Sequence, residues 1–93
     1  MPTGPPFEWD AAKDALNASK HCVSFEEAVE VFVDHKHADF DASHPEDGER
    51  RRKAVGMIDG RLFTVVYTVR GQAIRIISAR RANAYEVRRY DDR

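Results

Sequence analysis

The sequence of 93 residues has a single cysteine and no long apolar stretch. Cys22 cannot form a disulfide within the chain, so nothing in the sequence indicates an oxidising compartment. No window approaches the roughly 20 apolar residues of a membrane span, and residues 1–6 lack the positive and apolar regions of a secretory signal. These absences predict a soluble, cytoplasmic protein. The length of 93 residues predicts one domain over residues 1–93, of which residues 1–6 form a flexible N-terminus.

Basic residues are scarce in the first half of the chain. Residues 1–49 hold 3 Lys and Arg against 12 Asp and Glu, whereas residues 50–93 hold 12 against 4. The net charge of −1 therefore hides two halves of opposite sign. Binding responds to the local patch, because charges more than about 10 Å apart are screened by salt. The basic half suits a phosphate-bearing partner such as RNA.

The first elements are predicted from short local patterns. Residues 7–9 alternate as a strand, and Asp10 can cap a helix from Ala11 to His21. On this helix Leu16 is expected to point inward and Asn17 toward solvent. The beginning of the chain therefore has one strand followed by one helix.

The rest of the chain continues this mixed pattern. The capping box Ser24-Phe25-Glu26-Glu27 begins a second helix that ends near Val33–Asp34. Asp59-Gly60 is a strong hairpin signal. The later elements are strands at 38–42, 51–58 (interrupted at Gly56), 62–69 and 73–79 and a helix at 83–90. The expected fold is α+β: an antiparallel sheet with the two helices of the N-terminal half packed on one face and a C-terminal helix.

The arginines of the last third are candidates for phosphate binding. Metal-free RNA cleavage needs a base, an acid, and cations that hold the phosphate as charge accumulates. Arginine suits the last role because its planar fork matches phosphate oxygens. Arg75 and Arg80 tend to opposite faces of a strand, whereas Arg75 and Arg81 share one face if the strand is straight. The alternative is that all three form a solvated edge that prevents aggregation.

Motifs between Phe7 and Tyr90 resemble those of the BrnT toxin family. They are Phe7-Glu8-Trp9-Asp10, Lys13, Asn17, Lys20-His21, Val23-Ser24-Phe25-Glu26-Glu27-Ala28, Glu49, Arg51, Gly56, Arg75-Ile76-Ile77-Ser78-Ala79-Arg80, Glu86 and Tyr90. The resemblance implies a RelE-like fold and a metal-independent endoribonuclease that blocks translation without a cofactor. It also implies neutralisation by a BrnA antitoxin with a ribbon-helix-helix part, through which alone DNA is contacted. The family usually has glycine where this chain has Cys22, and glycine suits a left-handed helix cap.

Few side chains are candidates for proton transfer. Histidine titrates closest to neutral pH, but His21 at a helix end can also be a cap that the helix dipole stabilises. Lys20 and His21 stay candidates through the resemblance. Glu49 and Glu86, next to the basic half, can each accept a proton or hold an arginine. Glu86 precedes Arg89 and Tyr90 by three and four residues, the spacing of a structural pair.

The candidate residues form two overlapping sets, some supported by their chemistry and some only by the resemblance. The catalytic candidates are Lys20, His21, Glu49, Arg51, Arg75, Arg80 and Arg81. The RNA-binding candidates are Arg80, Arg81, Tyr85, Arg88 and Arg89.

Two further groups of residues are weighed and set aside. The spacing of the acids and histidines in the middle of the chain fits no common zinc pattern, so no metal site is expected. These residues are Asp34, His35, His37, Asp39 and Asp41. The aromatic residues at inward positions are expected in the core rather than stacked on bases. They are Trp9, Phe25, Phe32, Phe63 and Tyr67.

Two functions are consistent with these features. The first is a toxin of a type II toxin–antitoxin system, an endoribonuclease that acts on free or ribosome-associated RNA. The second is a non-catalytic RNA-binding or protein-interaction module that uses the same basic face, since phosphate contacts give affinity without chemistry.

Overall fold

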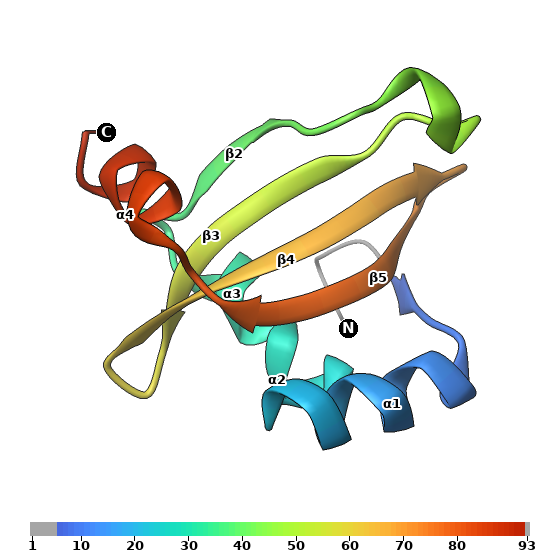
Figure 1. The fold of residues 1–93 in the computed structure, drawn as a ribbon, viewed down its shortest axis with the longest axis horizontal. Coiled ribbons are helices and arrows are strands. Elements are labelled where there is room, and N and C mark those ends of the chain that lie inside the picture. The colour runs from blue at the N-terminus through green and yellow to red at the C-terminus, as the bar shows by residue number, and fades with distance from the viewer. Residues whose placement is uncertain (1–5, 93) are drawn as a thin grey trace.

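A five-stranded sheet with helices on both faces makes up the fold (Figure 1). The structure, a computed structural model, describes residues 6–92, so most of the expected flexible N-terminus lies outside the described residues. The elements are β1 (Phe7–Glu8), α1 (Ala11–His21), α2 (Phe25–Ala28), α3 (Glu30–Val33), β2 (Ala38–Asp41), a 3-10 turn (Pro45–Asp47), β3 (Arg52–Ile58), β4 (Arg61–Arg70), β5 (Ala73–Arg81) and α4 (Ala84–Asp91). Within residues 6–92 no helix is long and apolar enough to cross a membrane.

The strand order is β1-β5-β4-β3-β2. Strands β2 to β5 pair antiparallel, as predicted, but β1 pairs parallel with β5, so the expectation of a purely antiparallel sheet is wrong. The short β1 adds to the outer edge of β5, where Phe7 lies opposite Ile74 and Glu8 opposite Arg75. Phe7 packs there against Phe32 of α3, with 5.2 Å between the ring centroids. Packing of this partly buried aromatic pair against the core fixes the position of the first strand.

The predicted second helix is divided into α2 and α3 at Val29. Its capping box forms as expected: the Glu27 N–H donates to Ser24 Oγ at 3.1 Å, and the Ser24 N–H donates to Glu27 Oε1 at 2.9 Å. The predicted interruption of β3 at Gly56 is wrong, because the strand is continuous. A Cβ at Gly56 would lie 2.7 Å from the Val31 carbonyl oxygen, so glycine lets α3 approach the sheet closely.

We call the two sides of the sheet the inner face and the outer face. The inner face carries the core residues that α2 and α3 cover, namely Ala54, Val65, Tyr67, Ile76 and Ala79. The outer face carries the alternate residues, namely Lys53, Val55, Thr64, Val66, Thr68, Arg75 and Arg80. Helix α4 packs on one end of the outer face, opposite to α3 (Figure 1). The helices of the N-terminal half therefore do not share a face with the C-terminal helix.

The predicted core aromatics lie in or against the core. Phe25 and Tyr67 are buried, and Trp9, Phe32 and Phe63 pack partly buried against the same cluster. The Phe32 ring makes edge contacts with Tyr67 at a centroid distance of 5.1 Å. These aromatics are therefore structural residues.

Helix α1 has a polar residue in the position expected for an apolar one. Asn17 is 7% exposed, whereas Leu16 is 70% exposed, so both predicted orientations are wrong. The Asn17 amide donates to the Ala79 carbonyl at 2.9 Å and accepts from the Ala79 N–H at 3.1 Å. After Arg75, β5 has no strand beside it on the side where β1 pairs. There Asn17 forms hydrogen bonds with the β5 backbone as a neighbouring strand would.

Helix α1 ends at a residue with left-handed backbone geometry. Cys22 has φ 60° and ψ 30°, and its N–H donates to the Ala18 carbonyl. This is the cap conformation that glycine favours, and Cys22 adopts it without glycine's freedom. Its side chain is exposed, so Cys22 does not serve as a packing residue.

Candidate active site on the outer face

A bulge in β5 brings two arginines to the same face. Val66 pairs with Ser78 and Tyr67 with Ile76, so Ile77 is an extra residue with no partner on β4. The bulge reverses the alternation. Arg75 pairs with Thr68 and Arg80 with Thr64, and both arginines therefore lie on the outer face. The sequence expectation for a straight strand, with Arg80 opposite to Arg75 and Arg81 on the same face as Arg75, is therefore wrong, because the bulge lies between them.

A buried carboxylate joins α4 to the outer face. Glu86 is 0% exposed and accepts two parallel hydrogen bonds of 2.8 Å from the Arg80 guanidinium. It also accepts from Lys53 Nζ at 3.1 Å, from the Thr64 hydroxyl at 2.9 Å and from the Asn83 N–H at 2.9 Å. One carboxylate therefore binds side chains from β3, β4 and β5.

Glu86 stays ionised because of these donors. Burial acts to raise the pKa of Glu86, but the hydrogen bonds from Arg80, Asn83, Lys53 and Thr64 outweigh it and lower the pKa to about 2. The predicted pairing of Glu86 with Arg89 and Tyr90 on its own helix is wrong. The Glu86 side chain points from α4 toward the sheet. It therefore pairs with Arg80 and Lys53 of the strands instead of with residues of its own helix.

The next cations along the outer face are held less firmly. Arg75 makes one contact of 3.1 Å with Glu8, whose side chain is 42% exposed. Arg51 lies 3.5 Å from Glu49 and 3.7 Å from Asp47, longer than a charge-assisted hydrogen bond of about 2.8 Å. Arg51 Nε is buried without a hydrogen-bond partner among the described residues. Apart from the buried Arg51 Nε, these guanidinium groups therefore keep donors available for a ligand.

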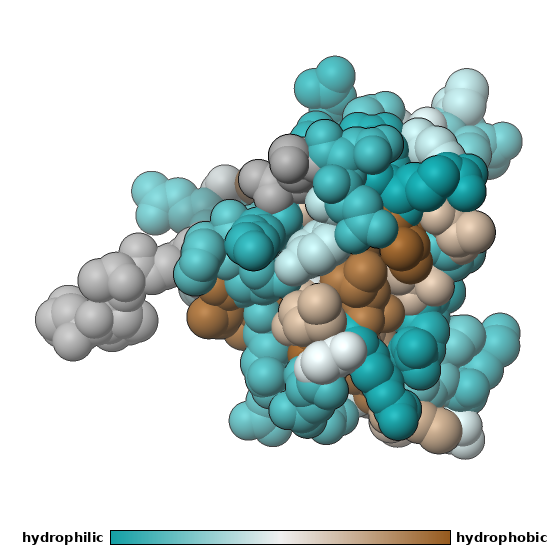
Figure 2. Space-filling view, turned by 90° about the vertical axis from the view of Figure 1, so that its left-hand side faces the viewer, coloured by the Kyte–Doolittle hydropathy of each residue, from teal (hydrophilic) through white to brown (hydrophobic). Residues whose placement is uncertain are grey.

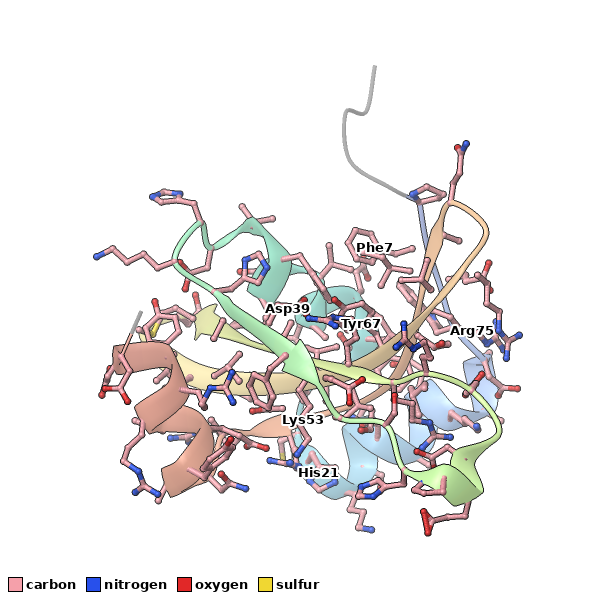
Figure 3. All side chains as sticks on the ribbon, turned by 90° about the horizontal axis from the view of Figure 1, so that it is seen from above. Phe7, His21, Asp39, Lys53, Tyr67 and Arg75 are labelled. Atoms are coloured by element: carbon pink, nitrogen blue, oxygen red, sulfur yellow. The ribbon has the colours of Figure 1, made fainter. Side chains whose placement is uncertain are left out.

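Lys53 was not among the residues singled out from the sequence. It lies on β3, two residues after Arg51, which directly precedes the strand; continuing the alternation of β3 by one residue places Arg51 and Lys53 on the same face. Its side chain is 27% exposed, and its contact with Glu86 uses one of its three donors. The two-residue spacing of Arg51 and Lys53 was the signal that could have identified it. In Figure 3 Lys53 lies between α4 and Arg75.

The predicted pair Lys20 and His21 ends α1 at the edge of β5. With Ile77 and Ser78 of β5, both line a hollow of about 220 Å³. Ser78 is paired with Val66 on the outer face, between the positions of Arg75 and Arg80. The bulge therefore adjoins the end of α1, and His21 lies at the border of the outer face.

The remaining predicted residues lie around α4 and the last residues of β5. Arg81 is exposed with its guanidinium 5.7 Å from the Phe63 ring centroid, so it belongs to a different side from Arg80. Arg88 is exposed on α4. Arg89 lies 4.2 Å above the Phe40 ring and donates to the Tyr85 hydroxyl at 2.9 Å. Tyr85 is 51% exposed, so an aromatic and cationic surface joins α4 to β2.

Two acids of the middle segment, Asp34 and Asp39, serve as hydrogen-bond acceptors. Asp34 accepts from the Met57 N–H at 2.9 Å and from the Tyr90 hydroxyl at 2.7 Å. Asp39 accepts from Arg52 at 2.5 Å and from the Tyr67 hydroxyl (Figure 3). Burial, and then Asp39, raise the pKa of Tyr67 to about 12, so this phenol stays protonated at neutral pH.

A comparison with protein families agrees with this geometry. The family model described as the ribonuclease toxin BrnT of type II toxin–antitoxin systems matches residues 9–86. The chain belongs to the BrnT family. A comparison with curated proteins gives no match.

Family membership gives the coarse function of this BrnT toxin. It is a ribonuclease toxin, which has RNA as its substrate and an antitoxin as its partner. The matched segment ends at Glu86 and includes Arg51, Lys53, Arg75 and Arg80. The RNA-binding candidates Arg88 and Arg89 lie beyond it, on the last turns of α4.

Glu86 makes the stability of this BrnT toxin dependent on pH. The lowered pKa of Glu86 means that its contribution is complete above pH 4.5 and is lost as the pH falls through about 2. Glu86→Gln should lower the free energy of unfolding at pH 7 by about 3–5 kcal/mol, because Arg80 and Lys53 lose a charged partner. It should also flatten the decline in acid. Urea unfolding between pH 2.5 and 7 measures both, with the exposed Glu26→Gln as control. Equal pH profiles for wild type and Glu86→Gln would contradict this role.

Proposed function

We propose that this chain is a metal-independent endoribonuclease with a RelE-like mode of action, which stops translation by cleaving mRNA. The observation that carries the proposal is the set of cations on the outer face, which we call the cationic row: Lys53 of β3 and Arg75 of β5 lie on either side of β4, and Arg51 directly precedes β3. These groups supply positive charge where a metal ion would otherwise be needed. The active site is then the part of the outer face between α4 and the β4–β5 hairpin.

Arg75 and Arg51 are the phosphate ligands in this proposal. In-line cleavage places growing negative charge on the non-bridging oxygens, and guanidinium groups in fixed positions stabilise that charge. Arg75 donates one hydrogen bond to Glu8, and Arg51 has only long contacts with the carboxylates of Asp47 and Glu49. Both can therefore turn donors toward a phosphate without breaking a buried ion pair.

Arg80 has a positioning role instead. Two of its guanidinium nitrogens donate to Glu86, and one of them also donates to the Arg81 carbonyl. Moving it onto a phosphate would leave a buried carboxylate without its main partner, at a cost of several kcal/mol. Arg80 therefore orients α4 and, through Glu86, Lys53.

In this proposal, residues at the end of α1 carry out proton transfer. Cleavage by the 2′-hydroxyl needs a group that removes its proton and a group that protonates the leaving 5′-oxygen. His21 is suited either to remove the 2′-hydroxyl proton or to protonate the 5′-oxygen. Lys20 or Lys53 is suited to stabilise the oxygen that His21 does not serve. Their place beside the bulge puts them at the border of the cationic row.

The direct test is RNA cleavage in the presence of EDTA. Wild type should produce fragments ending in 2′,3′-cyclic phosphate. Arg75→Ala should reduce the rate by about 10²–10³-fold, the usual loss when one donor to a developing charge is removed. The matched control is Arg61→Ala, an exposed arginine on the β3–β4 hairpin, which should cleave at the wild-type rate. Binding of RNA without fragments in EDTA would contradict the proposed metal-independent cleavage, and a repeat with Mg²⁺ would then separate a metal-dependent ribonuclease from a non-catalytic RNA-binding module.

The proposed partner is a BrnA-like antitoxin with a ribbon-helix-helix DNA-binding part. Its toxin-binding segment is expected to bring acidic and apolar side chains onto the surface near α4. Figure 2 shows apolar residues surrounded by hydrophilic ones on the side of the molecule where α4 and the β3–β4 hairpin lie. Met57 of β3, next to this hairpin, is 38% exposed. Buried anchors of this kind supply affinity, and complementary charge speeds association.

Antitoxin binding can be tested at Arg81, which is exposed at the end of β5 beside α4. Arg81→Ala should increase the dissociation rate of the complex by about tenfold, while Arg70→Ala at the other end of the sheet should leave it unchanged. Surface-binding kinetics with the co-purified antitoxin measures both rates. The same dissociation rate in Arg81→Ala and wild type would place the antitoxin on another surface.

A further inference from the structure

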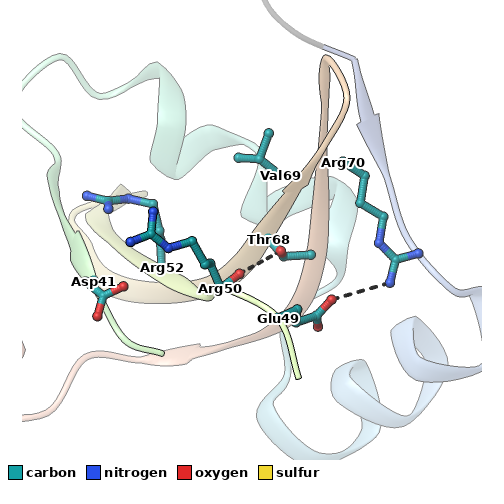
Figure 4. Close-up of a pocket in the computed structure, with 7 residues that line it drawn as sticks. All are labelled: Asp41, Glu49, Arg50, Arg52, Thr68, Val69 and Arg70. Atoms are coloured by element: carbon teal, nitrogen blue, oxygen red, sulfur yellow. Dashed lines mark hydrogen bonds and ion pairs between the residues drawn. The ribbon is translucent and has the colours of Figure 1, made fainter. Parts of the chain in front are cut away.

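A cavity of about 500 Å³ lies between the loop before β3 and the end of β4 (Figure 4). It exists because β4 continues past its last pair with β3, Arg52 with Tyr67. The loop that leads into β3 is held at this distance by a hydrogen bond of 2.7 Å from the Thr68 hydroxyl to the Arg50 carbonyl. The volume lies within the range of about 300–1,000 Å³ typical of sites for small ligands.

The cavity combines donors, acceptors and an apolar wall. Arg50, Arg52 and Arg70 line it together with Asp41 and Glu49. Figure 4 places Asp41 on one side and Glu49 with Arg70 on the other. The side chain of Val69, 58% exposed, also lines the cavity. Guanidinium planes and apolar side chains are surfaces on which bases of single-stranded RNA stack.

The balance of charge favours a base over a phosphate. Two carboxylates line the cavity, and a third, Asp39, binds the Arg52 guanidinium. A site for phosphate would show a clear excess of cations, which this cavity lacks. The edge of a nucleobase, with donors and acceptors side by side, matches a mixed lining instead.

Glu49 is the residue best placed to read such an edge. One of its oxygens lies 3.6 Å from Arg70 and the other 3.5 Å from Arg51, both longer than ordinary charge-assisted hydrogen bonds of about 2.8 Å. Its lone pairs therefore remain available. Arg70 beside it supplies a donor next to this acceptor. An acceptor next to a donor complements the Watson–Crick edge of guanine, whose N1–H and N2–H groups adjoin O6.

We infer that this cavity is a subsite that binds guanine in the RNA substrate, one or more nucleotides away from the cleaved bond. Glu49 accepts from N1–H and N2–H, Arg70 donates to O6, and Val69 covers one face of the base. The inference rests on the proposed function. Glu49 also connects the subsite to the cationic row, since it contacts Arg51, and Thr68 of the cavity is paired with Arg75.

Mapping of cleavage sites tests the inference. An RNA of mixed sequence is partially digested in EDTA by wild type, Glu49→Gln, Arg70→Ala and the control Arg61→Ala. Wild type and Arg61→Ala should cut with guanine at one fixed position relative to the cleaved bond. Glu49→Gln and Arg70→Ala should lose that preference. Thermal unfolding checks that each variant is folded, and Arg70→Ala carries the test if Glu49→Gln is not.

A synthetic substrate then tests the contact itself. Replacing guanine at the preferred position by inosine, which lacks the N2 amino group, should lower kcat/KM of wild type by about tenfold. The same replacement should change kcat/KM of Glu49→Gln by less than about twofold. Metal-free cleavage without a fixed guanine, or with a preference that both variants retain, overturns the inference and leaves the proposed function standing. Absence of metal-free cleavage by wild type overturns the proposed function and the inference with it.

Discussion

The structure depends on one buried carboxylate. Glu86 brings a single negative charge under α4, where Arg80, Lys53 and Thr64 converge on it from three neighbouring strands. Without this charge, two cations would face each other beneath a helix whose first turn could not pack against them. In the proposed mechanism the same contact commits Arg80 to structure and leaves Arg75 and Arg51 as the cations that bind the substrate.

The second constraint is the geometry of β5. One extra residue, Ile77, lets a single strand supply Ile76 and Ala79 to the core on one face and Arg75 and Arg80 to the other. A regular strand would have turned one of these arginines into the core or one of the apolar residues into water. The bulge thus separates an apolar face from a cationic face, and the separation makes a binding surface compatible with a stable domain.

Local chemistry predicted most of the elements, and contacts distant in sequence account for what was missed. The Asp10 cap and the Ser24 capping box lie where the sequence places them, because each depends on atoms three residues apart. Asn17 instead serves Ala79, 62 positions away, and Glu86 binds Lys53 at a separation of 33. The residue patterns that predict helices and strands carry no information on such distant pairs. The arginine-rich composition therefore predicted a cationic surface, but which arginine pairs with the buried Glu86 depends on the packing of α4.

The most direct test of this account is the position of a bound RNA. A structure with an oligonucleotide that carries a 2′-deoxy sugar at the cleavage site would hold the substrate uncut. The account predicts that the phosphate at the cleavage site lies within hydrogen-bond distance of Arg75 and Arg51, and that Arg80 stays bound to Glu86. A phosphate bound on the inner-face side of the molecule, or an Arg80 side chain that leaves Glu86 to bind it, would contradict the account.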